Sequence, residues 1–214
     1  MSEKTEIVLR FDGPQDASVT IVLAHGAGAA MDSDFMNMMS DGLVAHGYRV
    51  ARFEFPYMAK TRQDGRKRAP DRAAVLQECW GDVVAQIGHP ERLVIGGKSM
   101  GGRVASMMAD ELGVMGLVCL GYPFHPPAKP ETLRVTHLKT LRTPALIAHG
   151  TRDPFGRPDE VAEYGLSPAI SLHWVADGDH DFVPRISTGR TQADNIGDAV
   201  LAMNGFIRRL LVRE

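Results

Sequence analysis

The stretch LVIGGKSMGGR, residues 93–103, carries the clearest structural signal in the sequence. It starts with the apolar run Leu93–Ile95, which has the composition of a short buried strand. The run breaks into glycines on both sides of Ser99, and the residues that follow place apolar side chains at helical spacing. The stretch therefore predicts a strand, a tight turn at Ser99 and then a helix.

The turn matches the pattern G-x-S-x-G, in which a strained bend holds the serine hydroxyl exposed at the end of a strand. Side chains at Gly97 and Gly101 would collide across such a bend, and Gly102 would let the helix approach the sheet closely. The alternative is an ordinary glycine-rich loop, because the bare pattern also arises by chance. The flanking strand and helix favour a nucleophilic Ser99.

Length and composition indicate an ordinary globular protein. The 214 residues suffice for one domain spanning 1–214, and the hydrophobic (44%) and charged (23%) fractions are those of a typical soluble chain. A formal net charge of -2 gives no reason to expect nucleic acid or an anionic membrane as a partner. The N-terminal segment MSEKTEIVLR has no apolar signal core, so a cytoplasmic location is expected. The oligomeric state is not indicated.

The two cysteines, Cys79 and Cys119, fall in segments with apolar periodicity. We expect them to be small buried side chains and not a disulfide. Neither a cofactor nor a metal ion is expected.

Apolar runs alternate with amphipathic segments along the rest of the chain. Strands are predicted at residues 7–11, 19–24, 48–55, 93–95, 116–120, 145–149 and 170–175. Helices are predicted from about 32 to 46, over 71–87, after 99, over 131–141, from 158 and around 196–210. Residues 56–69 lack an apolar period and are expected to form a surface loop. The alternation predicts an α/β fold with about seven strands in a mostly parallel sheet and helices on both faces.

In such sheets, active groups gather at the carboxyl ends of the strands. Distinctive residues follow the predicted strands there: the loop 25–28, Ser99, Asp153 and His180. A serine hydroxyl needs an imidazole to take its proton, and a carboxylate must hold that imidazole in the correct tautomer. The chain order serine, acid, histidine fits this chemistry, so Ser99, Asp153 and His180 are the candidate catalytic residues.

Both partners of Ser99 have competitors. Among the eight histidines, only His180 follows the last predicted strand, whereas His25 and His149 precede glycines and are expected to support those loops by hydrogen bonds. Neighbouring aspartates also compete for the role of the acid: Asp177, Asp179 and Asp181. Asp153 is favoured because it follows the penultimate strand, and its neighbours are expected to order the histidine loop through local backbone hydrogen bonds.

Negative charge that develops on a substrate oxygen needs hydrogen-bond donors fixed in advance. The backbone N–H of Met100, directly after the candidate nucleophile, and that of Ala27 are expected to form this oxyanion hole. Gly26 and Gly28 would let a substrate reach the backbone. The alternative is a glycine turn that serves only to reverse the chain.

Several segments together resemble the α/β-hydrolase superfamily, near the dienelactone-hydrolase-like esterases: HGAG (25–28), GKSMGG (97–102), HGTRDPFG (149–156) and DGDHDF (177–182). GYPFHPP (121–127) followed by HGTRDPFG resembles a group of small bacterial predicted hydrolases. That group is itself similar to a testis-expressed eukaryotic protein and to a subunit of a chromatin acetyltransferase complex. The resemblance covers about residues 6–212 and implies the α/β-hydrolase fold. The chain differs from dienelactone hydrolases with a cysteine nucleophile in having Ser99.

The resemblance implies a serine hydrolase that cleaves a carboxylic ester or thioester, a small-molecule substrate, through an acyl-enzyme. A non-catalytic protein-interaction domain on the same fold and a serine peptidase are the alternatives. The segment between Leu120 and Ala145 is too short for a separate cap domain. We therefore expect an open site, in which Tyr122 and Arg62 contact substrate.

Residues 60–68 carry five basic side chains among nine positions and follow a predicted strand at the Ser99 edge of the sheet. If these side chains meet substrate, esters with a free carboxylate or phosphate should be preferred over neutral analogues. Neutralising Arg62, Arg66 and Arg68 together should then remove the preference. The alternative is a solvated loop whose charges only keep it in water.

Overall fold

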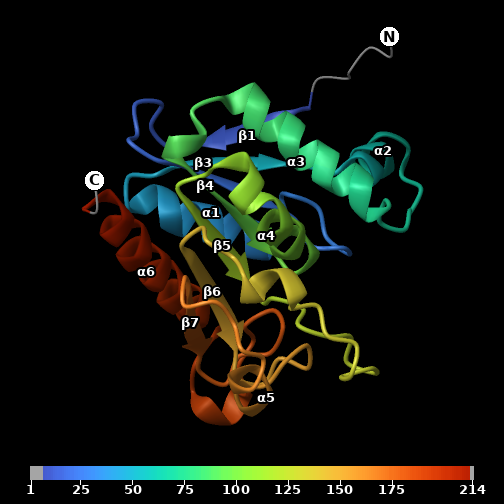
Figure 1. Ribbon diagram of the computed structural model, residues 1–214, viewed down its shortest axis with the longest axis vertical. Helices are drawn as coiled ribbons and strands as arrows, with labels where there is room; N and C mark the ends of the chain where they lie inside the picture. Colours follow the sequence, from blue (N-terminus) through green and yellow to red (C-terminus); the bar gives the residue numbers. More distant parts are fainter. Residues whose placement is uncertain (1–6, 213–214) are drawn as a thin grey trace.

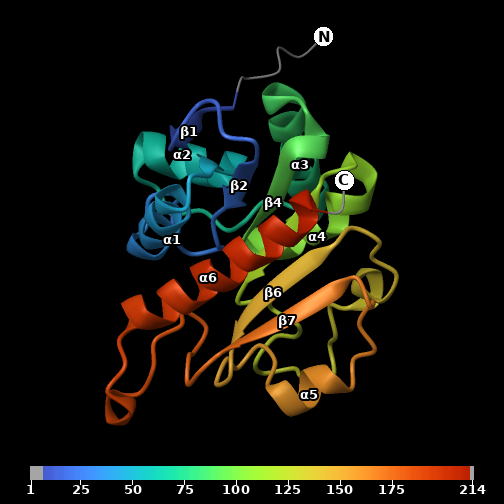
Figure 2. The ribbon, with the colours of Figure 1, turned by 90° about the vertical axis from the view of Figure 1, so that its left-hand side faces the viewer.

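The computed structural model describes residues 7–212. Residues 1–6 and 213–214 of the expected 1–214 domain lie outside it, including most of the N-terminal segment considered for a signal. One seven-stranded sheet runs through the described part, and helices cover both of its faces (Figures 1 and 2). The predicted fold class is thereby confirmed.

The strands are β1 (Leu9–Asp12), β2 (Thr20–Ala24), β3 (Arg49–Phe53), β4 (Leu93–Lys98), β5 (Gly116–Leu120), β6 (Ala145–Gly150) and β7 (Ile170–Val175). The α-helices are α1 (Asp34–Ala45), α2 (Pro56–Asp64), α3 (Ala73–Ile87), α4 (Met100–Leu112), α5 (Pro158–Ala162) and α6 (Gln192–Leu211). Short 3-10 turns are η1 (Pro90–Arg92), η2 (Thr136–Lys139) and η3 (Ile186–Thr188).

The strand order is β1-β3-β2-β4-β5-β6-β7, and only β1 runs antiparallel to its neighbour. The order reverses direction between β2 and β4, which pair side by side with Ala24 opposite Gly97. In open α/β sheets, the crevice at such a switch point is where ligands bind. The topology therefore places the loop after β2 directly beside the turn after β4.

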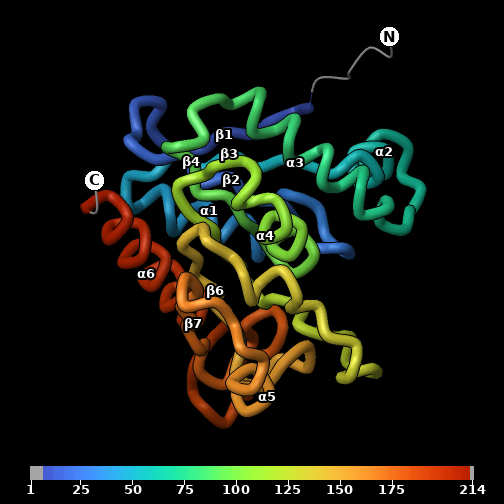
Figure 3. Tube along the Cα trace, in the orientation of Figure 1, coloured from blue at the N-terminus to red at the C-terminus, as the bar shows by residue number. Residues whose placement is uncertain are grey.

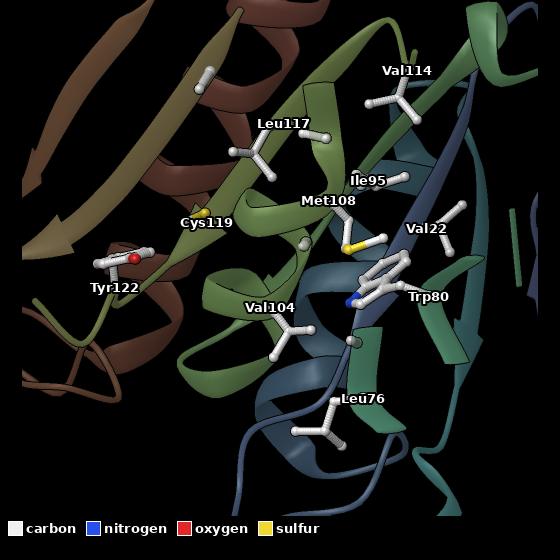
Figure 4. Close-up of a cluster of buried hydrophobic side chains, with 14 of the residues drawn as sticks. Val22, Leu76, Trp80, Ile95, Val104, Met108, Val114, Leu117, Cys119 and Tyr122 are labelled. Carbon is white, nitrogen blue, oxygen red and sulfur yellow. The ribbon is translucent and has the colours of Figure 1, made fainter. Parts of the chain in front are cut away.

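Two apolar layers hold the helices on the sheet. On one face, α3 and α4 bury Trp80, Val104 and Met108 against sheet residues such as Val22 and Ile95 (Figure 4). On the other face α1 and α6 pack together, and Figure 2 shows α6 crossing in front of the sheet with α3 and α4 behind. Each fully buried large apolar side chain contributes about 1.5–3 kcal/mol to the burial free energy. The free thiols of Cys79 and Cys119 are buried in the first layer, as predicted.

The predicted surface loop over 56–69 is wrong in its first part, because Pro56–Asp64 forms α2. Pro56 at the first helical position has a backbone angle that suits a helix start, and Gly65, with φ of 74°, ends the helix. Only Tyr57 of this helix is buried, so the segment has no apolar stripe to reveal it in the sequence.

The helix predicted over 131–141 is also wrong, since only the 3-10 turn η2 forms there. The backbone N–H of Arg134 donates to Phe124 O at 2.7 Å, and its carbonyl accepts from the Tyr122 hydroxyl at 2.9 Å. These tertiary hydrogen bonds occupy the groups that a helix would need. Among the described residues, η2 is the one regular element between β5 and β6, so no cap domain is inserted there.

The segment after β5 instead projects from the body of the molecule as an open loop, seen at the lower right of Figure 3. Across residues 7–212, no helix is both long enough and apolar enough to span a bilayer.

Candidate active site

Ser99 lies in the strained turn that the sequence predicts. Its φ of 51° and ψ of -114° belong to a conformation that non-glycine residues rarely adopt, at a cost of about 1–3 kcal/mol. The neighbouring glycines make the turn possible. A Cβ on Gly97 would lie 2.1 Å from Ala24 O, and one on Gly101 would lie 2.6 Å from the same oxygen. A Cβ on Gly102 would lie 2.5 Å from Gly97 O, so any side chain here would displace backbone.

The structure brings the three candidate catalytic residues together from loops after β4, β6 and β7. His180 Nδ1 lies 2.7 Å from Asp153 Oδ2, and His180 Nε2 lies 2.9 Å from Ser99 Oγ. An ionised carboxylate only accepts hydrogen bonds, so Nδ1 carries the proton and donates it to Asp153. Nε2 is then the acceptor for the Ser99 hydroxyl, which is the arrangement that a general base requires.

The Asp153 carboxylate is completely buried. Burial alone would raise its pKa, but the hydrogen bond from His180, the nearby His149 ring and the Phe155 N–H hold the pKa below its usual value. The Phe155 N–H donates to Asp153 Oδ1 at 2.9 Å, and His149 Nε2 lies 3.6 Å from Oδ2 while donating to Gly156 O at 2.8 Å. Asp153 is therefore a fixed anion with ordered donors around it.

The competing aspartates have other partners. Asp177 pairs with Arg185, and Asp179 Oδ1 accepts the backbone N–H groups of Asp181 and Val183, each at 2.9 Å. Asp179 thus orders the loop that carries His180 through local backbone hydrogen bonds, as expected from the sequence.

The loop after β2 lies against Ser99, since a Cβ on Gly26 would be 3.7 Å from Ser99 Cβ. The Gly26 carbonyl accepts from His25 Nδ1 at 2.6 Å and from the Tyr57 hydroxyl at 3.4 Å. In a trans peptide the next N–H points the opposite way, so these bonds turn the Ala27 N–H away from His25 and Tyr57. Burial lowers the pKa of His25, which keeps this anchoring ring neutral.

Met100 and Gly28, the other residues whose backbone was predicted to face a substrate, follow Ser99 and Gly26 closely in the chain. Met100 is the first residue of α4, where helix N–H groups have no partner within the helix. Gly28 is exposed, and nothing lies within 4 Å of a Cβ built on it. Access to the backbone is therefore open beside Gly28.

Lys98, which was not predicted from the sequence as a site residue, directly precedes Ser99 in the chain. Its side chain is only 8% exposed, and its Nζ donates to the carbonyl of His180 at 2.7 Å and pairs with Asp181 at 3.2 Å. Burial lowers the pKa of this ammonium, while Asp181 and further carboxylates oppose the shift. A lysine that ends a strand of apolar residues and glycines is the signal that could have revealed it.

The two side chains predicted to contact substrate, Tyr122 and Arg62, both have partners within the protein. The Tyr122 side chain has no exposed surface and donates its hydroxyl to Arg134 O. The Arg62 guanidinium is already bound, to Glu54 at 2.7 and 2.9 Å and to Asp32 at 2.7 Å. Sequence spacing does not reveal which side chains are used internally in this way.

No cluster of three or more His, Cys, Asp or Glu side chains within residues 7–212 is arranged to hold a metal ion.

Solved structures share this fold. A serine hydrolase homologue from Coxiella burnetii is similar with a TM-score of 0.70 and 15% identity, over 94% of this chain and 97% of that one. A dienelactone hydrolase from Anabaena variabilis has a TM-score of 0.73 and 17% identity, over 97% of this chain and 93% of the other. A serine hydrolase without a lid from Xanthomonas campestris has a TM-score of 0.66 and 20% identity, over 95% and 88%.

The sequence itself matches the model of the alpha/beta hydrolase domain over residues 17–208. That range contains every strand from β2 to β7 and the loops that carry Ser99, Asp153 and His180. The match and the solved structures agree with the resemblance to small bacterial hydrolases near the dienelactone hydrolases. The chain belongs to the α/β hydrolase domain family.

Proposed function

We propose that this chain is a serine hydrolase that cleaves a carboxylic ester or thioester through an acyl-enzyme. The observation that supports it most directly is the hydrogen-bonded series Ser99 Oγ, His180 imidazole and Asp153 carboxylate, with distances of 2.9 and 2.7 Å. A fold alone does not decide function. A serine in a strained turn, a base within hydrogen-bond reach and a buried acid behind it are the parts that acyl transfer needs.

In the proposed reaction, Ser99 Oγ attacks the carbonyl carbon of the substrate while His180 Nε2 takes the hydroxyl proton. The carbonyl oxygen gains negative charge, and the N–H groups of Met100 and Ala27 stabilise it. His180 then gives the proton to the departing alcohol or thiol, which leaves an ester on Ser99. Water, deprotonated by the same imidazole, releases the acid and restores the serine. Asp153 remains ionised throughout and stabilises the imidazolium.

The chemical class of the substrate is tested with purified protein and aryl esters, acyl thioesters and short peptides of graded length. Hydrolysis of esters or thioesters, absent in Ser99→Ala, is the expected result. Cleavage of peptides with no ester turnover would favour the serine peptidase. A protein that hydrolyses none of them would favour the interaction domain, since the fold serves that role equally well.

Lys98 provides a prediction about the position of the base. Lys98→Met keeps an apolar stem of similar length but removes the donor to His180 O. Hydrogen bonds from charged groups contribute about 1.5–3 kcal/mol, so we expect kcat to fall about 10-fold or more while KM changes little. Steady-state kinetics on a neutral ester measure both constants, and the thermal unfolding midpoint checks the fold.

Asp181→Asn is the matched control for Lys98→Met. It removes the exposed partner of Lys98 but leaves the bond from Nζ to His180 O in place. We expect its kcat to stay within about twofold of wild type, because Asp181 is largely exposed to water and the bond to His180 O remains. If Lys98→Met kept the wild-type kcat, Lys98 would only fill space and would not help to position His180.

A further inference from the structure

Two partly buried arginines come from segments that start at the candidate active site. Arg103 lies in the first turn of α4, and its backbone N–H donates to Ser99 O at 3.0 Å. Arg134 lies in the segment that begins at Gly121, where a Cβ would be 3.3 Å from His180 Nδ1. Both arginines are therefore connected by a short stretch of chain to the reacting groups.

A small polar network fixes the backbone of both arginines. The Ser106 hydroxyl donates to Arg103 O at 2.7 Å, and the Tyr122 hydroxyl donates to Arg134 O at 2.9 Å. His137 Nε2 joins the two, at 2.8 Å from Ser106 Oγ and 3.4 Å from the Tyr122 hydroxyl. Tyr122 is buried, and its hydroxyl fixes the backbone carbonyl of Arg134.

The two guanidinium groups lack a counter-charge within the described residues. Neither forms an ion pair or a side-chain hydrogen bond there, and Arg103 Nε is buried without a partner. Burial, followed by repulsion from Arg103, lowers the pKa of Arg134, and the same two causes lower the pKa of His137 to about 4. His137 is consequently neutral and does not add to the charge. Positive charge that is even partly removed from water without an anion beside it is unfavourable.

The arginines of α2 and of the segment directly after it differ in this respect. Arg62 is bound to Glu54 and Asp32, and Arg68 is bound to Asp64 at 2.6 Å. Two of the three arginines that the sequence analysis assigned to an anionic substrate are thus already neutralised. Arg66 is exposed and its side chain forms no ion pair with another described residue, which makes it a suitable control.

We propose that Arg103 and Arg134 together bind a carboxylate or phosphate group carried by the ester or thioester that Ser99 attacks. The inference rests on the proposed function and adds the class of substrate. Helix geometry places the Cα of Arg103 about 6 Å along the axis from Ser99, and side chains on a helix lean toward its N-terminus. Guanidinium groups bind such anions through paired hydrogen bonds, so they select as well as attract.

The test compares aryl esters of equal length that end in a carboxylate, a phosphate or a neutral amide, at low salt. For wild type we expect kcat/KM to be about 10-fold higher, or more, for at least one anionic ester than for the neutral one. In the Arg103→Gln, Arg134→Gln double variant this ratio should fall to about one. The ratio is measured on one preparation, so a loss of folded protein cancels from it.

Arg66→Gln is the matched control and should keep the wild-type ratio. Loss of the preference in Arg66→Gln, with retention in the double variant, would assign anion binding to the chain after α2 and overturn the inference. A wild-type ratio near one for both anions, with the neutral ester still cleaved, would overturn it while leaving the proposed hydrolase in place. Failure to cleave any ester would overturn both.

Discussion

Ser99→Ala is expected to abolish ester hydrolysis and labelling by a fluorophosphonate probe. The probe reacts with an activated serine hydroxyl, and the 2.9 Å contact between Ser99 Oγ and His180 Nε2 provides that activation. Loss of the nucleophile in a serine hydrolase lowers kcat by about 10⁶-fold. Peptide mapping of the labelled wild-type protein should place the adduct on Ser99.

Ser187→Ala is the control for this experiment, because Ser187 is an exposed serine in η3 and is not one of the three proposed triad residues. It should label at the wild-type rate. An adduct on any serine other than Ser99 would contradict the assignment of the nucleophile. A folded protein that forms no adduct and cleaves no ester would favour the interaction domain.

Asp153→Asn is expected to lower kcat by about 10⁴-fold with little change in KM. The carboxylate is the acceptor that keeps the proton on His180 Nδ1, whereas an amide can present its NH₂ group and favour the other tautomer. Nε2 would then carry a proton and lose its ability to accept one from Ser99. Steady-state kinetics on a neutral ester measure the effect, and thermal unfolding verifies that the variant is folded.

Single substitutions of the neighbouring aspartates distinguish this role from a general effect of charge. Asp177→Asn and Asp179→Asn should be milder, since Asp177 pairs with Arg185 and Asp179 accepts from the backbone. If either of them loses activity to the extent expected of Asp153→Asn, while Asp153→Asn stays near wild type, the assignment of the acid is wrong.

The sequence was most informative where backbone geometry restricts the residue type. The glycines around Ser99 are needed because a Cβ there would meet the backbone of β2, so the turn leaves a local pattern. The apolar runs of β2, β4, β5 and β6 are likewise visible, because strands buried on both faces contain little else. A few topological rules then fix the strand order. That order places Asp153 and His180 at the carboxyl ends of neighbouring strands.

Contacts between distant polar side chains were not predictable. The bond between Lys98 and the carbonyl of His180 joins positions 82 residues apart and leaves no periodic signal. The same holds for Arg62, whose charge is satisfied by Glu54 and Asp32, and for Tyr122, whose burial depends on the course of the following loop. A run of basic residues shows that charge is present but does not show which charge is already paired.

The order of the strands in the chain also affects how the protein is made. The proposed nucleophile, Ser99, directly follows the central strand β4. Its proposed base, His180, follows β7, the last strand to leave the ribosome, and lies 81 residues later in the chain. At about 5–20 residues per second, synthesis of that interval takes roughly 4–16 s. During this time the nascent chain has a serine turn but no histidine to activate it. If the proposed mechanism holds, fragments that terminate before β7 should be inert toward acyl groups, and hydrolysis would begin only after translation has passed residue 180.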